Sequence, residues 1–145
     1  MGTFASASRT TGANAARDAA INAVAATLNN GTVRIYSGTA PTNADAALSS
    51  NTLLAQATLG ATAFGAASSG VVTANSITAD SSADATGTPT FFRLLASNGT
   101  TVVYQGTAGA SGQELNLSGL SGGQIVAGGS VSISSLTMTQ TASYA

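Results

Sequence analysis

Apolar residues follow two different periods along this chain. Near its start, Ile21, Val24 and Leu28 recur at the spacing of one helix face. They lie in a segment rich in alanine, the strongest helix former. Asn29-Asn30-Gly31 then supplies residues that tolerate the left-handed conformation at a helix end. The pattern predicts an α-helix over residues 14–30, preceded by an extended N-terminal arm over residues 1–13 whose only large side chain is Phe4.

From residue 31 onward the period changes to two, as Val33 and Ile35 alternate with Arg34 and Tyr36. Similar runs, separated by glycine, proline or asparagine, predict further strands. The predicted strands cover Thr32–Ser37, Thr52–Leu59, Val71–Thr78, Pro89–Ser97, Thr100–Gly106, Glu114–Ser118, Gly123–Ala127 and Ser130–Thr139. Roughly eight short strands with such turns are typical of an antiparallel β-sandwich or a jelly-roll-like barrel. We therefore expect a mainly β chain, in which residues 31–145 form a β-sandwich and the whole is a single globular domain.

Three local patterns refine this prediction. Asn98-Gly99 is the dipeptide that a two-residue hairpin turn prefers, because both central residues need a positive φ. The alternation of the last strand slips by one residue at Ser134-Ser135, which predicts a β-bulge. Residues 79–88 are small and polar, and we expect a mobile loop there.

Charged residues are scarce, and this limits the classes of partner. Only 6% of the 145 residues are charged, lysine is absent, and the net charge is −1. Nucleic acids and anionic membrane surfaces require clustered basic residues, so neither is an expected partner. No apolar run is long enough to span a membrane, and the N-terminus lacks the pattern of a secretory signal. Large apolar side chains are also few, so we expect the chain to gain stability by oligomerisation.

The residue types present argue against catalysis. Histidine, cysteine and lysine are absent, which removes nucleophile–base pairs, Schiff bases, disulfides and ordinary zinc sites. The absence of cysteine leaves the redox compartment open. None of the five acidic residues stands in an apolar, aromatic setting that would make it a general acid. We expect no enzyme activity, no cofactor and no metal.

Two further motifs are of the kind that can bind ligands. Asp80 and Asp84 are the only acids close together, but their spacing matches no calcium-binding loop, so a solvated loop is favoured over a cation site. Gly122-Gly123 and Gly128-Gly129 lack the lysine and the strand-to-helix context of a phosphate loop, and are interpreted as turn glycines.

The candidate interface residues come from two predicted strands and from the N-terminal arm. Alternation places Arg93 on the same strand face as Phe91 and Leu95. Arg93 is then an anchor at a subunit contact, a buried residue with an intrachain partner, or simply exposed. The remaining candidates are Arg34 and Tyr36, which form a second pair of this kind, and Phe4, which anchors the arm on a neighbour if the arm is not a frayed end.

The order of these elements resembles a group of small virion proteins of tailed bacteriophages. The resemblance spans about Ile21 to Thr139. It is carried by the alanine-rich helix with Leu28-Asn29-Asn30-Gly31-Thr32-Val33-Arg34-Ile35-Tyr36-Ser37-Gly38-Thr39-Ala40-Pro41, by Leu53-Leu54-Ala55 with Thr58-Leu59, and by Gly87-Thr88-Pro89-Thr90-Phe91-Phe92-Arg93-Leu94 with a hairpin closing at Gly106. Within that group the chain resembles the capsid cement, or decoration, proteins, which sit on the capsid exterior as β-rich trimers.

This resemblance implies a non-enzymatic structural protein. It would bind the major capsid protein as a homotrimer and stabilise the shell, on the capsid exterior of the virion, after synthesis in the host cytoplasm. The expected partners are the major capsid protein and other copies of the chain. The family has no catalytic residues, so none are expected here.

Two other functions remain open. A tail-fibre or head-fibre module that binds glycans would also be β-rich, but sugar sites usually stack on exposed aromatic rings. The chain has no tryptophan and only three tyrosines, Tyr36, Tyr104 and Tyr144. A structural protein of the tail or neck would differ in copy number and ring symmetry.

Overall fold

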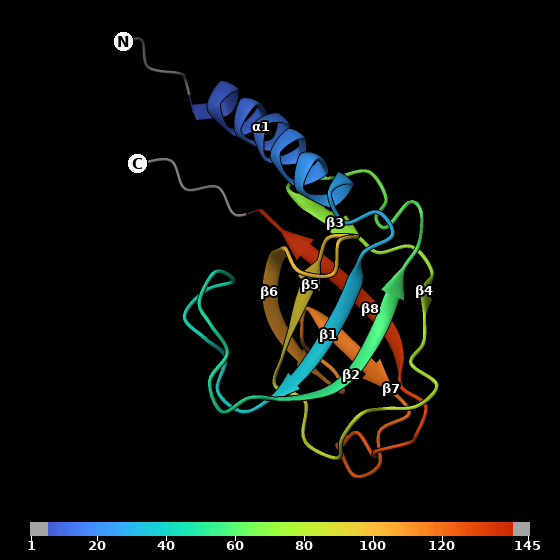
Figure 1. Cartoon of the computed structure of the whole chain (residues 1–145). Coiled ribbons are helices and arrows are strands. Elements are labelled where there is room, and N and C mark those ends of the chain that lie inside the picture. The colour runs from blue at the N-terminus through green and yellow to red at the C-terminus, as the bar shows by residue number, and fades with distance from the viewer. Residues whose placement is uncertain (1–5, 141–145) are drawn as a thin grey trace.

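The computed structural model describes residues 6–140, with side chains from residue 14 onward. In this part of the chain, one helix is followed by eight strands (Figure 1). The elements are α1 (Ser6–Ala26), β1 (Thr32–Ser37), β2 (Thr52–Leu59), β3 (Val71–Thr73), β4 (Ile77–Thr78), β5 (Phe91–Leu95), β6 (Val102–Gly109), β7 (Leu115–Ser118) and β8 (Ser132–Thr139). The predicted mainly β fold class with a single helix is confirmed.

The strands form one curled sheet in the order β3-β8-β7-β6-β5-β1-β2-β4. Every neighbouring pair is antiparallel except β6 and β7, which run parallel. Just past β4, Asp80 exchanges two backbone hydrogen bonds with Val131, at the start of β8. This bridge brings the two ends of the sheet together, so the sheet curls into an incomplete barrel.

The core fills the inside of this curl. It is built from the inward side chains of the strands, such as Val33, Ile35 and Phe92, from Ile21 in α1, and from Leu28 in the turn that follows the helix. From residue 14 onward, where its side chains are described, α1 contributes Ile21 and Ala25 to the core. Its first half extends beyond the strands (Figure 1).

Neither edge of the sheet is left open. At the β3 edge, the Gly65 amide donates to the Thr73 carbonyl at 3.0 Å, and Phe64 forms a bridge with Ala74. At the β2 edge, the Gln56 amide donates to the Asp80 carboxylate at 2.8 Å, and the Asp84 amide donates to the Leu54 carbonyl at 2.8 Å. Covered edges of this kind prevent uncontrolled strand pairing between molecules.

The segment over residues 79–88 is therefore not the mobile loop that its composition predicts. Ala83 is buried and its amide donates to Gly129, while Gly87 forms a bridge with Ile125. Small residues allow this segment to pack closely along β2 and against residues 125–129. The predicted strand over Gly123–Ala127 is likewise replaced by turns with isolated bridges.

The helix begins at Ser6, so most of the predicted extended arm over residues 1–13 is helical instead. Serine, threonine and glycine lower the helix propensity of that stretch, but propensity is a weak prior and no proline interrupts it. The helix ends at Ala26, ahead of the predicted residue 30. A turn follows, in which Asn30 adopts the left-handed conformation at φ 59°. Phe4 lies outside the described residues.

Two local predictions have different outcomes. The bulge in the last strand is confirmed, because Asn116 pairs with Ser135 and Leu117 with Ile133, which leaves Ser134 unpaired. The hairpin turn is longer than the predicted two residues. Its closing bond runs from the Ala96 amide to the Thr101 carbonyl, and only Gly99 has a positive φ.

Candidate interaction surface

Five of the six candidate residues lie on the outer face of β1 and β5. Strand register pairs Arg34 with Arg93 and Tyr36 with Phe91, and paired residues share a face. Leu95 lies on the same face, opposite Thr32. The alternation in the sequence predicts that Phe91, Arg93 and Leu95 share a face, which the register confirms. It does not predict that β1 and β5 are neighbours.

Arg93 is the most constrained side chain of this face. It is only 5% exposed, and its Nε donates to Gln105 Oε1 at 2.9 Å. Its Nη2 donates to the carbonyls of Ala46 at 2.6 Å and Asn43 at 3.4 Å. Of the three interpretations of Arg93, the structure supports the buried residue with partners in the same chain. The predicted role as an exposed subunit anchor is corrected, because the chain's own 38–51 loop covers the guanidinium.

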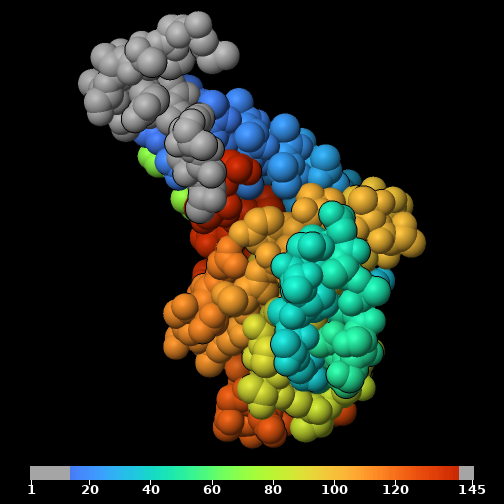
Figure 2. All heavy atoms as spheres, turned by 90° about the vertical axis from the view of Figure 1, so that its left-hand side faces the viewer, coloured from blue at the N-terminus to red at the C-terminus, as the bar shows by residue number. Residues whose placement is uncertain are grey.

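The 38–51 loop connects β1 to β2 and projects from the body of the molecule (Figure 1), so it lies at the front of the view in Figure 2. Side chains hold it at several points besides Arg93. Gln105 Nε2 donates to Pro41 O at 2.8 Å, and Asn51 Nδ2 donates to Thr39 O at 2.8 Å. Within the loop, Asn43 Oδ1 accepts from the amides of Asp45 and Ala46. The loop is thus a fixed structure rather than a flexible connection, and no local sequence pattern reveals this.

The aromatic candidates are buried beside Arg93. The rings of Tyr36 and Phe91 stack with centroids 5.1 Å apart, and their exposed fractions are 5% and 1%. Leu95 is 2% exposed. All three residues are buried on the outer face of the sheet, so they are not available as the open contact surface that the sequence predicts.

Arg34 is the member of this group that solvent reaches. Its Nε donates to Gln56 Oε1 at 2.9 Å, and its Nη2 donates to Gly99 O at 3.4 Å. The outer face therefore carries a polar row across four strands, in the order Gln56, Arg34, Arg93 and Gln105. No carboxylate among the described residues forms a salt bridge with either arginine, and only neutral oxygens accept their hydrogen bonds.

A second polar group lies at the inner face of β6. The Tyr104 hydroxyl donates to Glu114 Oε1 at 2.5 Å, and Glu114 Oε2 accepts from the Thr107 amide. Burial raises the pKa of Tyr104 to about 12, and the hydrogen bond and charge of Glu114 add to this, whereas the backbone of Thr139 acts in the opposite direction. The Glu114 carboxylate fits there because Gly106 has no side chain. This cluster ties β6 to the start of β7.

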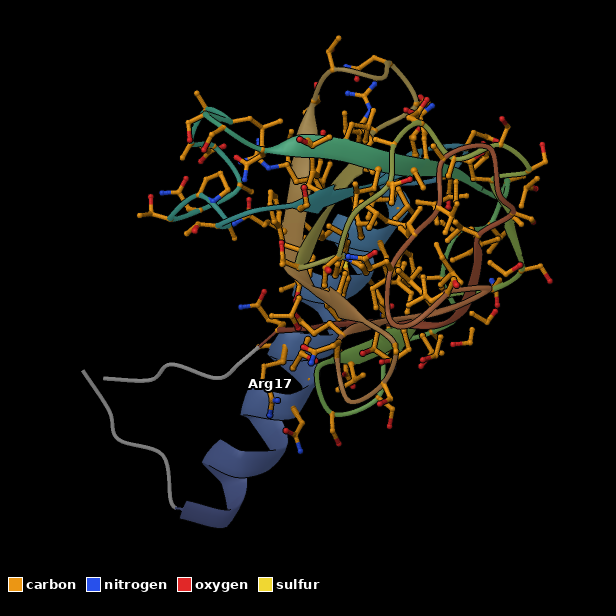
Figure 3. All side chains as sticks on the ribbon, turned by 90° about the horizontal axis from the view of Figure 1, so that it is seen from below. Arg17 is labelled. Atoms are coloured by element: carbon orange, nitrogen blue, oxygen red, sulfur yellow. The ribbon has the colours of Figure 1, made fainter. Side chains whose placement is uncertain are left out.

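Besides its apolar core residues, the helix is attached to the sheet by polar contacts that sequence reasoning missed. Arg17 Nε donates to the Gln140 carbonyl at 2.9 Å, and Asp18 Oδ1 accepts from the Gly70 amide at 2.6 Å. Figure 3 shows Arg17 at the side of α1 that meets the sheet. Asn22 Oδ1 accepts from the Ala67 amide at 3.0 Å. A shallow depression of about 190 Å³ lies between this part of the helix and residues 62–66.

Of the acidic pair Asp80 and Asp84, the Asp80 carboxylate has a structural use. Asp80 Oδ2 accepts from the Gln56 amide and its Oδ1 accepts from the Ser82 amide, at 2.8 and 2.9 Å. Over residues 6–140, no three acidic, histidine or cysteine side chains come together as metal ligands. No helix in the same range is long and apolar enough to cross a membrane.

No protein family, no curated protein and no solved structure matches this chain.

Proposed function

We propose that the chain is a non-enzymatic structural protein of a tailed-phage virion, which binds the major capsid protein shell as a homotrimer and stabilises it. The observation that supports this most is the projecting helix α1. Its 21 residues span about 31 Å at 1.5 Å per residue, and its first half extends beyond the strands (Figure 1). Isolated helices are marginal in water, so a helix that projects in this way gains stability by packing against another chain.

The exposed side of α1 suits such packing. Ala15, Ala16, Ala19, Ala20 and Ala23 are all exposed. Alanine side chains allow two helix backbones to approach closely, and they lose no side-chain entropy on contact. Three copies that share this face would bury the helices along a common axis.

The rest of the surface suits repeated neutral contacts. It carries few charges, its sheet edges are covered, and its 38–51 loop is held by Arg93 and Gln105. A preordered loop loses little entropy on binding. Many equivalent weak contacts on a shell then add up by avidity rather than through one tight site.

The glycan-binding alternative has less support. Tyr36 is buried and Tyr104 is partly buried, so neither offers an open ring face to a sugar, and Tyr144 lies outside the described residues. A location in the tail or neck agrees with the same geometry. The number of copies of the chain in each particle distinguishes it from a location on the capsid.

The decisive experiment is the copy number of this chain relative to the major capsid protein in purified particles, by quantitative mass spectrometry. A ratio near one, or a simple fraction set by trimers on the shell lattice, is the expected result. A few copies to some dozens would move the protein to the tail, fibre or neck. Absence from particles would overturn the virion proposal, and a monomer in light scattering at high concentration would overturn the trimer.

A further inference from the structure

Arg34 and Arg93 form an unusual charge arrangement in a protein with so few charges. They are opposite each other on antiparallel strands, where like charges are unfavourable. Arginine stays protonated in proteins, so neither can relieve the repulsion by losing a proton. Neutral amide and carbonyl oxygens accept their hydrogen bonds, and Arg34 remains open to solvent. The outer face thus carries positive charge that no carboxylate of the described chain neutralises.

Most of the acidic residues are already engaged within the chain. Asp18, Asp80 and Glu114 accept hydrogen bonds from Gly70, from Gln56 and Ser82, and from Tyr104 and Thr107, respectively. In contrast, the side chains of Asp45 and Asp84 are exposed and accept no hydrogen bond from the described residues. Two carboxylates are therefore available to a second molecule.

Asp45 is the better placed of the two. It lies in the 38–51 loop, which projects from the body (Figures 2 and 3). The hydrogen bonds of Arg93 to Asn43 and Ala46 fix the backbone on both sides of Asp45. The carboxylate is thus presented outward on a rigid support, which lowers the entropy lost on binding.

We propose that Arg34 is an intermolecular carboxylate site, and that in the assembled protein it binds Asp45 of a second copy. The contact joins two different surface patches, the loop of one copy and the outer strand face of the next. Such head-to-tail contacts close into a ring when the rotation between copies permits it. This inference rests on the proposed self-assembly and names the residues that direct it.

The pairing follows from the chemistry of both groups. The planar guanidinium of arginine can bind a carboxylate through two parallel hydrogen bonds. The Nη1 atom of Arg34 takes part in no hydrogen bond within the described chain, which leaves it free to donate outward. An incoming carboxylate would also offset the repulsion between Arg34 and Arg93.

The test measures self-association of the full chain by light scattering and sedimentation over a range of concentrations. Arg34→Gln and Asp45→Asn each remove one partner, and Asp84→Asn is a matched control with the same change in net charge. We expect Arg34→Gln and Asp45→Asn each to weaken association about tenfold, a typical coupling for a close interfacial charge pair. Asp84→Asn should leave association unchanged. Salt near 1 M, where the Debye length is about 3 Å, should weaken the wild type in the same way.

Two further variants guard against a trivial folding defect. Gln56→Glu places a carboxylate beside Arg34 within the same chain, where Gln56 already accepts from its Nε at 2.9 Å. It should raise the melting temperature of the subunit and yet weaken association, because Arg34 is then already paired. The reversed pair, Arg34→Asp with Asp45→Arg, should restore association that either change alone weakens.

The outcomes separate this inference from the proposed function. Wild-type association of Arg34→Gln, or equal weakening by Asp84→Asn and Asp45→Asn, would overturn the Arg34–Asp45 contact while leaving the virion role to the copy-number measurement. An Arg34→Gln protein that self-associates normally but no longer binds capsids would also overturn it, in favour of a carboxylate on the capsid. Failure of the reversed pair, with all variants folded, would count as a refutation too.

Discussion

Arg93→Ala should destabilise the protein strongly, although the removed residue is charged and lies on the outer face of a sheet. Its guanidinium holds the 38–51 loop through the carbonyls of Asn43 and Ala46, and it is 5% exposed. Without it, the side chain of Gln105 loses its hydrogen-bond donor and the loop loses its main attachment.

The magnitude can be worked from these contacts. Hydrogen bonds to a charged group contribute about 1.5–3 kcal/mol each. Three are lost, but the loop carbonyls regain water once the loop opens, and the repulsion from Arg34 disappears. We therefore expect a net loss of about 2–4 kcal/mol, a large part of the 5–15 kcal/mol that is typical of a domain. Arg93→Lys keeps the charge but not the planar fork, and should lose about half as much.

Urea unfolding measures this directly. With a slope of about 2 kcal/mol/M, the midpoint should fall by about 1–2 M for Arg93→Ala. Hydrogen exchange should also become faster at the amides of Asp45 and Ala46, which depend on the loop conformation. Arg34→Ala is the control, and should lose less than about 1 kcal/mol because water replaces its partners. If Arg93→Ala unfolds within 1 kcal/mol of the wild type and its loop exchanges as before, the anchoring role is refuted.

Three other perturbations test contacts that hold elements of the fold together. Gly106→Ala should cost about 1–3 kcal/mol in urea unfolding, because its methyl group would collide with the Glu114 carboxylate; an unchanged midpoint would contradict this. Gly70→Ala should cost at least about 2 kcal/mol, since φ is +78° there and the new Cβ would lie 2.7 Å from Arg17 Nε; the helical signal in circular dichroism is the second readout. Stability should fall as the pH rises from about 10 to about 12, because the unfolded chain ionises Tyr104 at its ordinary pKa while the folded chain holds the proton to about 12. Tyr104→Phe should remove that part of the fall, and an equally steep loss in the variant would argue against it.

The strands could be predicted wherever alternation and turn residues agree. Both β1 and β2 have the predicted bounds, because residues that favour turns flank each run. The start of α1 could not be predicted, since serine, threonine and glycine there signal an arm. The local sequence also does not reveal that Asp18 of the helix accepts a hydrogen bond from the Gly70 amide, a contact that helps to hold the helix. The segment 79–88 is predicted as a mobile loop for the same reason. Its hydrogen bonds to β2 join residues that are far apart in the sequence, and local composition does not reveal them.

The candidate interaction surface shows the same limit of prediction from local sequence. Alternation alone placed Phe91, Arg93 and Leu95 on one face, and the register confirms it. Whether that face is open depends on the 38–51 loop, whose position is set by Arg93 itself and by Gln105, residues far away in the sequence. An outward strand face is exposed only if no connection folds back over it, and this cannot be read from local spacing.

Only 6% of the residues are charged, and their positions indicate which structural roles they have. Several of them join elements that are distant in sequence: Arg17 and Asp18 hold α1 to the sheet, Asp80 holds the β2 edge, Arg93 holds the 38–51 loop, and Glu114 holds β6. Neutral residues supply most of the surface, so charge there is not needed for general solvation. Among the described side chains, the exposed charges that connect no elements are Asp45 and Asp84, and Arg34 is only partly engaged. These are therefore the positions where contact with another molecule has a specific electrostatic consequence.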